Sequence, residues 1–494
     1  MALGTISITQ TPTNASSKFP VIVDGNPIIP YSVKQTDISG LFYFKFVLEI
    51  RIDDASGTLL AKIKQRKNGS TTGTSNVTAI FDVKEIVKTQ LSRTIKDPND
   101  TDLDDTSSVW ALGTSPTTDI FALNNNQILK IYVKAYQEFS SAANTMPEEN
   151  TTTTANATFY YINGRSDYNM VRASTYFQIV IMPQYQMNAN TRYMLSDLRL
   201  SPILSKYSNY GTNGTDDLGN CLVNYVNTSD YHCIAFLNGD NGSGLDFDSP
   251  AYKIRVAYYN ETTAGATADI TNATGQGGAV PSGTTASNQG LLHFGCGPAN
   301  LEAQTISGMT NLKPSNNTYT HYSIHAIDGS NAQKSRMYWF IKDDCNPKDY
   351  KIRRLAWLNS MGCWDFYNFK MKSTQTLDIQ RNNFSKLRGE YNDATYSYTN
   401  YSRGKETLKV DTKIKETIST DYIPEQYVPF IESLLVSKEV YLVKDSTSTL
   451  LENTSRAVMI TDSNFIRKTS ANDSLIEYTI NLEHANNLIA TGIN

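Results

Sequence analysis

The segment Phe42–Ile52 constrains the fold of this chain more than any other. Apolar side chains occupy every second position, and most of the positions between them are polar or charged. Such alternation is typical of an antiparallel strand with one buried face and one solvated face. The turn-forming run Asp53–Gly57 then predicts a hairpin whose second strand covers Leu59–Lys64. The chain therefore contains antiparallel β-structure.

The composition extends this expectation to the rest of the chain. Tyrosine is abundant, with 30 residues against 4 tryptophans, and only 19% of the residues are charged. Tyr and Thr favour strands, whereas Asn, Ser and Gly favour the turns between them. A length of 494 residues exceeds what one hydrophobic core supports. We therefore expect a mainly β protein of several domains.

Shorter β-like runs continue to about residue 345. The predicted strands are 127–139, 158–164, 177–182, 231–237, 252–259, 319–327 and 336–342. A short helix is expected within Ala79–Leu91, with Asp82 as its N-cap. The stretch Asn260–Gln289 is rich in Gly, Thr, Ala and Ser, and this composition predicts a long surface loop.

The last third of the chain mixes the two periodicities. Leu408–Ile414 alternates like a strand, whereas Ile423–Val436 places its apolar residues at helical spacing. Either Pro424 or Pro429 would lie in the first turn of this helix, where proline is tolerated. Further strands are expected at 439–444, 456–461 and 475–483.

These patterns predict a mainly β, multidomain chain. We expect two immunoglobulin- or fibronectin-III-like β-sandwiches followed by a C-terminal α+β module. The expected parts are an N-terminal arm at 1–30, a β-sandwich at 31–165, a second β-sandwich with long loops at 166–345, and an α+β assembly module at 346–494.

An aromatic stretch, Leu355–Lys370, opens the C-terminal module. Asn359–Gly362 is expected to form a tight turn in which Gly362 adopts positive φ, and an alternating strand follows from Cys363. Aromatic side chains on both faces require cover on both faces. They either form the core of the module or contact a neighbouring subunit. The candidate interface or core anchors are Trp357, Leu358, Gly362, Trp364, Phe366, Tyr367 and Phe369.

Charge and hydropathy argue against several classes of partner. A net charge of −4 gives no electrostatic footprint for nucleic acid or an anionic membrane. No run approaches ~18 apolar residues, the length that a transmembrane helix needs. The segment Met1–Ser7 lacks the positive and apolar regions of a signal peptide, so we expect synthesis in a cytoplasm.

No motif points to catalysis, a cofactor or a metal. The five cysteines are odd in number and contain no CxxC pair. His321 and His325 have the spacing of a helical metal pair but lie in strand-like sequence, and Asp240–Asp248 lacks the glutamate that closes a calcium loop. Nucleophile-elbow and phosphate-loop motifs are missing from the sequence. We therefore expect a protein that is not an enzyme and holds no cofactor.

Several segments resemble virion proteins of tailed bacteriophages, including phages of marine bacteria and of Bacteroidetes. Arg354–Phe369 is similar to their L-x-W-L-N-x-L-G-G-W-D-x-F-x-F signature, from which it departs at Met361, Cys363 and Tyr367. The other similar segments are Phe44–Ile50 and Phe81–Val87 in the first β-domain, and Ser437–Leu442, Val458–Thr469 and Leu475–Ile480 in the closing module.

The resemblance implies a non-enzymatic structural subunit of the phage tail or baseplate. Such a subunit is made in the host cytoplasm, is located in the virion, and contacts copies of itself and other tail proteins as a homo-oligomer. The alternative is a receptor- or glycan-binding adhesin or tail-fibre protein, since Tyr- and Asn-rich loops suit sugar stacking and hydrogen bonding. A glycan-degrading tail enzyme is disfavoured, because no repeat and no convergent carboxylate motif is visible.

Overall fold

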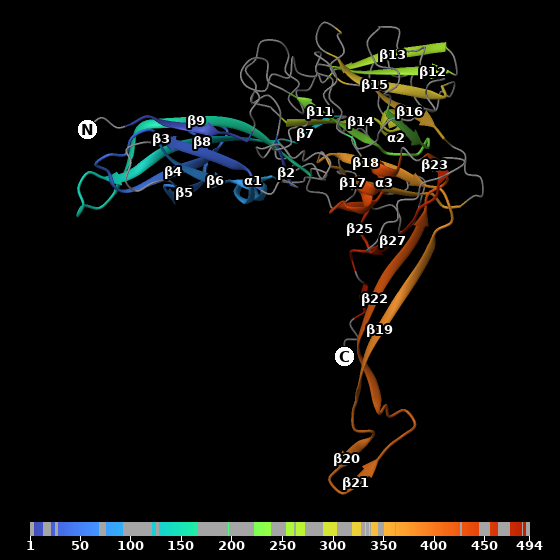
Figure 1. Cartoon of the computed structure of the whole chain (residues 1–494). Coiled ribbons are helices and arrows are strands. Elements are labelled where there is room, and N and C mark those ends of the chain that lie inside the picture. The colour runs from blue at the N-terminus through green and yellow to red at the C-terminus, as the bar shows by residue number, and fades with distance from the viewer. Residues whose placement is uncertain are drawn as a thin grey trace. The chain divides into compact units, whose positions relative to one another are not determined.

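The structure is a computed structural model that places strands along most of the chain it describes (Figure 1). The described residues are 4–12, 21–24, 28–68, 76–91, 121–124, 128–165, 196, 222–238, 253–260, 263–271, 290–303, 319–327, 331, 335, 337–343, 350–360, 362–424, 427–443, 455–462, 475–486 and 488–490. The fold is mainly β and contains several sheets, as the sequence predicts.

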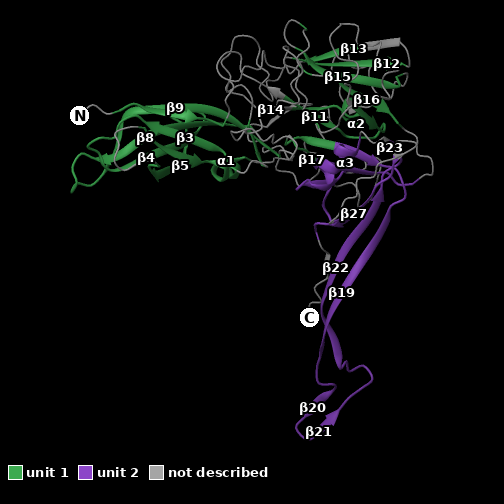
Figure 2. Cartoon of the chain, in the orientation of Figure 1, with its two compact units in different colours: residues 1–343, 358–365 green, residues 344–357, 366–494 purple. Residues whose placement is uncertain are grey.

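The chain divides into two compact units (Figure 2). Unit 1 comprises Met1–Asp343 together with Leu358–Asp365, and unit 2 comprises Asp344–Trp357 together with Phe366–Asn494.

Two sheets at the start of unit 1 share one hydrophobic core. One sheet has the order β2-β9-β8-β4-β5, with β2 (Val21–Asp24), β9 (Glu148–Arg165), β8 (Ile128–Ser140), β4 (Phe42–Ile52) and β5 (Leu59–Arg66). The other has the order β1-β3-β6, with β1 (Ile6–Gln10), β3 (Pro30–Gln35) and β6 (Val77–Asp82). The hairpin predicted from the alternation of Phe42–Ile52 is confirmed, since β4 and β5 pair antiparallel.

Two details of this region differ from the sequence-based expectation. Helix α1 (Lys84–Gln90) begins one residue later than predicted, after Val83. Asp82 still belongs to strand β6, and its Oδ1 accepts hydrogen bonds from the backbone N–H groups of Ile29 and Lys84. Strands β1 and β2, expected within an N-terminal arm, belong to the sheets because side chains such as Val21 are buried in the core.

The described residues in the remainder of unit 1 form two more sheets. One has the order β10-β16-β15-β12-β13, with β10 (Leu222–Val226), β16 (Tyr338–Lys342), β15 (His321–Ile327), β12 (Lys253–Asn260) and β13 (Thr263–Thr271). The other has the order β11-β14-β7, with β11 (Cys233–Asn238), β14 (Gly290–Gly295) and β7 (Phe121–Asn124), and α2 covers Pro298–Ala303. The predicted loop at Asn260–Gln289 is wrong at its start, because β13 pairs antiparallel with β12.

Unit 2 is built on an eight-stranded sheet. Its order is β18-β17-β24-β25-β27-β22-β19, and β28 pairs with β22. The strands are β18 (Trp364–Phe369), β17 (Arg353–Leu358), β24 (Val440–Leu442), β25 (Arg456–Ile460), β27 (Thr479–His484), β22 (Lys405–Ser419), β19 (Thr374–Ser385) and β28 (Leu488–Ala490). Small pairs are formed by β20 (Glu390–Asn392) with β21 (Thr395–Ser397), and by β23 (Ile423–Pro424) with β26 (Leu475–Ile476).

The predicted amphipathic helix is α3, Val428–Leu435. Pro429 lies in its first turn, whereas Pro424 belongs to strand β23. Its buried residues include Phe430, Ile431 and Leu434, three of the residues that the helical spacing placed on one face. The sequence pattern therefore identified both the helix and its core-facing side.

Candidate functional site

The aromatic stretch folds into β17, a tight turn and β18; the turn and the strand after it were predicted, and β17 was not. Gly362 has a φ of +78°, and its N–H donates to the carbonyl of Asn359 at 3.1 Å. The backbone N–H of Asn359 in turn donates to the carbonyl of Cys363 at 2.8 Å. A Cβ at position 362 would lie 1.9 Å from the carbonyl oxygen of Asn163 in unit 1, so both the turn and the packing require glycine.

The predicted anchors are mostly buried. Trp357 and Phe369 have no exposed surface, and Trp364 and Phe366 have less than 5%. Leu358 and Tyr367 are half-buried. Helix α3 covers Trp357, whose ring centroid lies 4.8 Å from that of Phe430. Most side chains of the aromatic stretch therefore belong to the core and do not form an exposed interface.

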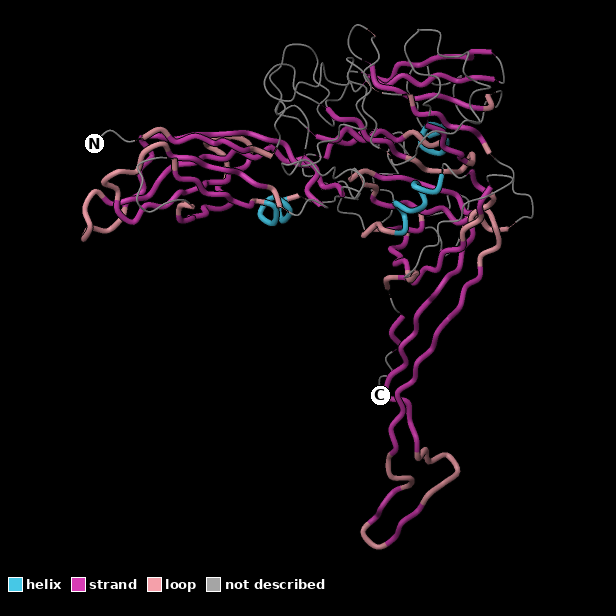
Figure 3. The backbone as a smooth tube through the Cα atoms, in the orientation of Figure 1, coloured by secondary structure: helices cyan, strands magenta, loops and turns pink. Residues whose placement is uncertain are grey.

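The exposed element is a long hairpin that leaves the body of unit 2. Strands β19 and β22 pair antiparallel from Thr374↔Thr417 to Ser385↔Lys405, and Figure 3 shows them side by side with the β20–β21 pair at their far end. We call residues 374–419 the hairpin arm. All of β19 is exposed apart from Asp378, which is half-buried. The sequence analysis predicted only its segment 408–414.

The two faces of the hairpin arm differ in chemistry. Directly opposed residues share a face, and so do residues two apart on one strand. One face, the charged face, includes Asp378, Lys409, Asp411, Lys413 and Lys415. Its ion pairs are Lys415–Asp378 at 2.6 Å, Lys409–Asp411 at 2.8 Å and, with β27, Lys413–Glu483 at 2.9 Å.

The opposite face carries apolar side chains. Leu377 lies opposite Ile414, Ile379 opposite Thr412, and Arg381 opposite Val410. Leu377 is 52% exposed and Ile379 is 45% exposed. We call Leu377, Ile379, Val410 and Ile414 the apolar stripe. Val410 and Ile414 are half-buried, so Leu377 and Ile379 supply most of the exposed aliphatic surface, and such surface is typical of an interaction site.

The far end of the hairpin arm carries a group of exposed tyrosines. We call Tyr391, Tyr396, Tyr398 and Tyr401 the tyrosine tip; their exposed fractions are 77%, 46%, 59% and 93%. The rings of Tyr391 and Tyr396 lie 6.1 Å apart, and those of Tyr396 and Tyr398 lie 6.2 Å apart. The guanidinium of Arg388 lies over the ring of Tyr398, 5.2 Å from its centroid. Tyr and Arg in this setting are the residue types that dominate recognition surfaces.

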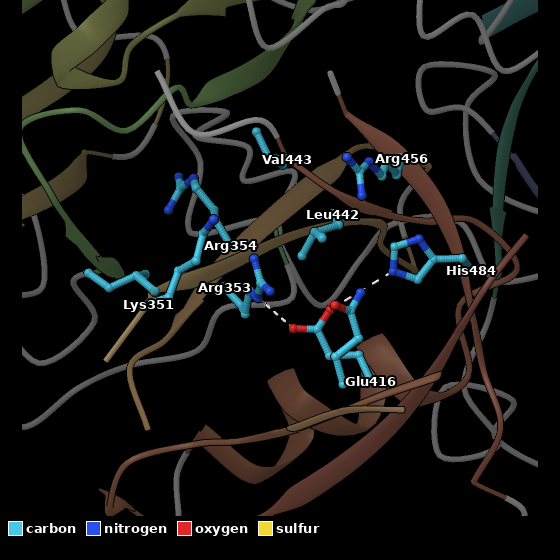
Figure 4. A pocket seen from close by; sticks show the side chains of 10 residues that line it. Lys351, Arg353, Arg354, Glu416, Leu442, Val443, Arg456 and His484 are labelled. Atoms are coloured by element: carbon cyan, nitrogen blue, oxygen red, sulfur yellow. Dashed lines mark hydrogen bonds and ion pairs between the residues drawn. The ribbon is translucent and has the colours of Figure 1, made fainter. Parts of the chain in front are cut away.

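A buried ionic cluster holds the base of the hairpin arm (Figure 4). Arg353 of β17 donates from Nε to Oε1 of Glu416 of β22, and Nε2 of His484 lies 3.9 Å from the other carboxylate oxygen. Burial raises the pKa of Glu416, but His484 and Arg353 outweigh it and leave that pKa below its usual value. Strands β17 and β22 are not neighbours in the sheet order, so this contact joins the arm to a distant strand.

The residues that the sequence analysis weighed as metal ligands lie in β15 or outside the described residues. They contain no group of three or more His, Cys, Asp or Glu side chains that could hold a metal. His321 and His325 lie on strand β15; the imidazole of His321 stacks on Tyr259, and burial lowers its pKa to about 4. Asp240–Asp248 lies outside the described residues. Among the described helices, none combines the length and the apolar character needed to cross a membrane.

Comparison with known proteins adds no assignment, because neither a family model nor a curated protein matches the chain.

Proposed function

We propose that the chain is a non-enzymatic structural subunit of a bacteriophage virion, located in the tail or baseplate and made in the host cytoplasm. The observation that carries the proposal is the hairpin arm, whose strand β19 is exposed along its length and which continues as a two-stranded ribbon beyond the residues of β22 that pair with β27 and β28. An isolated two-stranded ribbon is marginally stable in water. Neighbouring subunits that pack against such an arm would bury its exposed side chains, as happens in an assembled particle.

The rest of the proposed architecture follows the sequence expectation. Residues 31–165, joined by β1 and β2, and residues 166–345, joined by β7, are the two immunoglobulin- or fibronectin-III-like sandwiches, and residues 346–494 are the α+β assembly module. The shared core of the first two sheets supports the first sandwich, and the packing of α3 on Trp357 supports the module. In this proposal the domains present the hairpin arm, and the partners are copies of the chain and other tail proteins.

The first test is the mass of the full-length chain over a concentration series, measured by sedimentation, together with immunogold labelling of purified phage particles. We expect mass to rise with concentration and gold to label tails. The matched variant replaces residues 376–415 by Asn-Gly, which closes a two-residue turn between Gln375 and Glu416 and removes the apolar stripe. This variant should fold but assemble less. A chain that remains monomeric throughout and is absent from particles would refute the proposal.

The tyrosine tip favours a second candidate, a receptor- or glycan-binding adhesin. The charged residues at the tip, Arg388, Glu390, Asp393 and Arg403, sum to zero, which suits a neutral polar ligand better than a polyanion. The test is a glycan array with the full chain and with Tyr391→Ala/Tyr401→Ala. Specific binding that is lost in the double variant would favour the adhesin. An array with no binding would leave the structural role in place.

A further inference from the structure

We infer that the apolar stripe of the hairpin arm is a homotypic interface that packs against the same stripe on a second copy of this chain. The inference rests on the proposed structural function and deepens it, because it names both the surface and the partner.

The distribution of charge shows which face of the hairpin arm is suited to be covered. On the charged face, Asp378 and Asp411 are already engaged by lysines of the same ribbon, so that face is satisfied in water. On the stripe face, the positions from Gln375 to Arg381 and from Val410 to Ile414 carry one charge, that of Arg381. The next position, Glu416, is buried. Covering the stripe therefore removes apolar surface from water and requires little desolvation of charge.

The same distribution favours a second copy as the partner. A surface that packs against itself must avoid placing like charges opposite each other. The stripe meets this condition, because aliphatic and Thr side chains fill its positions from Leu377 and Ile414 to Ile379 and Thr412. An acidic partner would find a single complementary charge on this face, that of Arg381, and the stripe residues offer none to a basic partner.

The free edge of β19 strengthens the inference. Strand β19 is the last strand in the order of its sheet, and it is twelve residues long. Lysine, proline and bulges usually protect such an edge. β19 contains neither lysine nor proline, and the irregularity in its pairing places the extra residue, Leu408, on β22. The hairpin arm of a second copy can therefore pack on the stripe without being blocked at the edge of β19.

The size of the interface sets the expected strength. The stripe spans about five residues per strand, from Leu377 to Arg381 and from Val410 to Ile414, or ~17 Å at ~3.4 Å per residue, and is about 10 Å wide. Two stripes would thus bury roughly 350 Å², below the ~1,200 Å² of a stable standard interface. We therefore expect weak, concentration-dependent association of free chains, strengthened when several copies are held together.

The experiment compares two full-length double variants of equal charge. Leu377→Glu/Ile379→Glu places two carboxylates on the stripe, and Thr376→Glu/Gln380→Glu places two on the opposite face of the same strand. All four positions are exposed, so both variants should fold. We expect the stripe variant to raise the concentration for half-assembly at least tenfold, and the control to change it less than twofold.

Cross-linking provides the second readout. Leu377→Cys and Ile379→Cys should give disulfide-linked dimers under mild oxidation, whereas Gln380→Cys should give no more than the wild-type chain with its native thiols. Equal effects of the two glutamate variants, the absence of cross-links at both stripe positions, or a chain that remains monomeric at high concentration would overturn the inference. Labelling of phage tails by antibody would in that case still support a structural subunit, now held by other proteins.

Discussion

The indole Nε1 of Trp357 donates a hydrogen bond to the hydroxyl of Ser433, 2.9 Å away. The bond joins strand β17 to helix α3, and both residues are buried. The two most conspicuous features of the C-terminal sequence, its aromatic stretch and its amphipathic helix, thus meet in one contact.

Removing either partner should destabilise unit 2. Ser433→Ala leaves a buried indole N–H without its acceptor and should cost about 1–3 kcal/mol. Trp357→Ala also creates a cavity and should cost about 3–5 kcal/mol. Thermal unfolding of the full chain measures both, with Tyr401→Ala, which changes a 93% exposed side chain, as the control. Equal stability of Ser433→Ala and the control would contradict the role of the bond.

The turn at Gly362 should not accept a side chain. Gly362→Ala places Cβ against the carbonyl of Asn163 and forces a positive φ, and we expect a loss of at least about 2 kcal/mol. Gly404→Ala is the matched control, because the nearest atoms to its Cβ lie 3.8 and 3.9 Å away. Urea unfolding of the two variants should therefore separate them clearly. Similar midpoints would show that the turn can relax.

Acid should weaken an ionic network on unit 1. Hydrogen bonds from Lys64, Lys62 and the hydroxyl of Tyr136 lower the pKa of Glu149 to about 2. Because the folded pKa lies below the ordinary value, the stabilisation is complete above about pH 5 and is lost as the pH falls toward 2. We expect the free energy of unfolding of the wild type to exceed that of Glu149→Gln by less than about 1 kcal/mol at pH 7, because Glu149 and its two lysines are partly exposed. That difference should disappear near pH 2; a constant difference would exclude the charge as its cause.

Neutralising Glu416 should loosen the base of the hairpin arm. Glu416→Gln leaves the largely buried Arg353 without its counter-charge and should cost about 3 kcal/mol. Asp378→Asn is the control, because its pair with Lys415 is exposed and should contribute less than about 1 kcal/mol. Hydrogen exchange of the amides at 415–419 should accelerate in the first variant only. Unchanged exchange would show that strand pairing alone holds the base.

Local pattern predicted the elements whose burial is regular. The alternation at Phe42–Ile52 identified β4 and its turn, and helical spacing identified α3. The same reasoning missed β13, because the apolar residues that alternate in it are mostly alanines, which favour strands weakly, and the segment becomes a strand by pairing with β12. It also missed most of the hairpin arm, since exposure on both faces removes the burial contrast on which periodicity depends.

The sequence by itself determined strand β4, the tight turn at Gly362 and helix α3, because those depend on neighbouring side chains and backbone preferences. Only the tertiary structure decided that the aromatic anchors are largely core. It also decided that Arg353 reaches Glu416 across non-adjacent strands, and that the apolar stripe is left outside. These outcomes depend on which distant strands pair, and local sequence does not encode that choice.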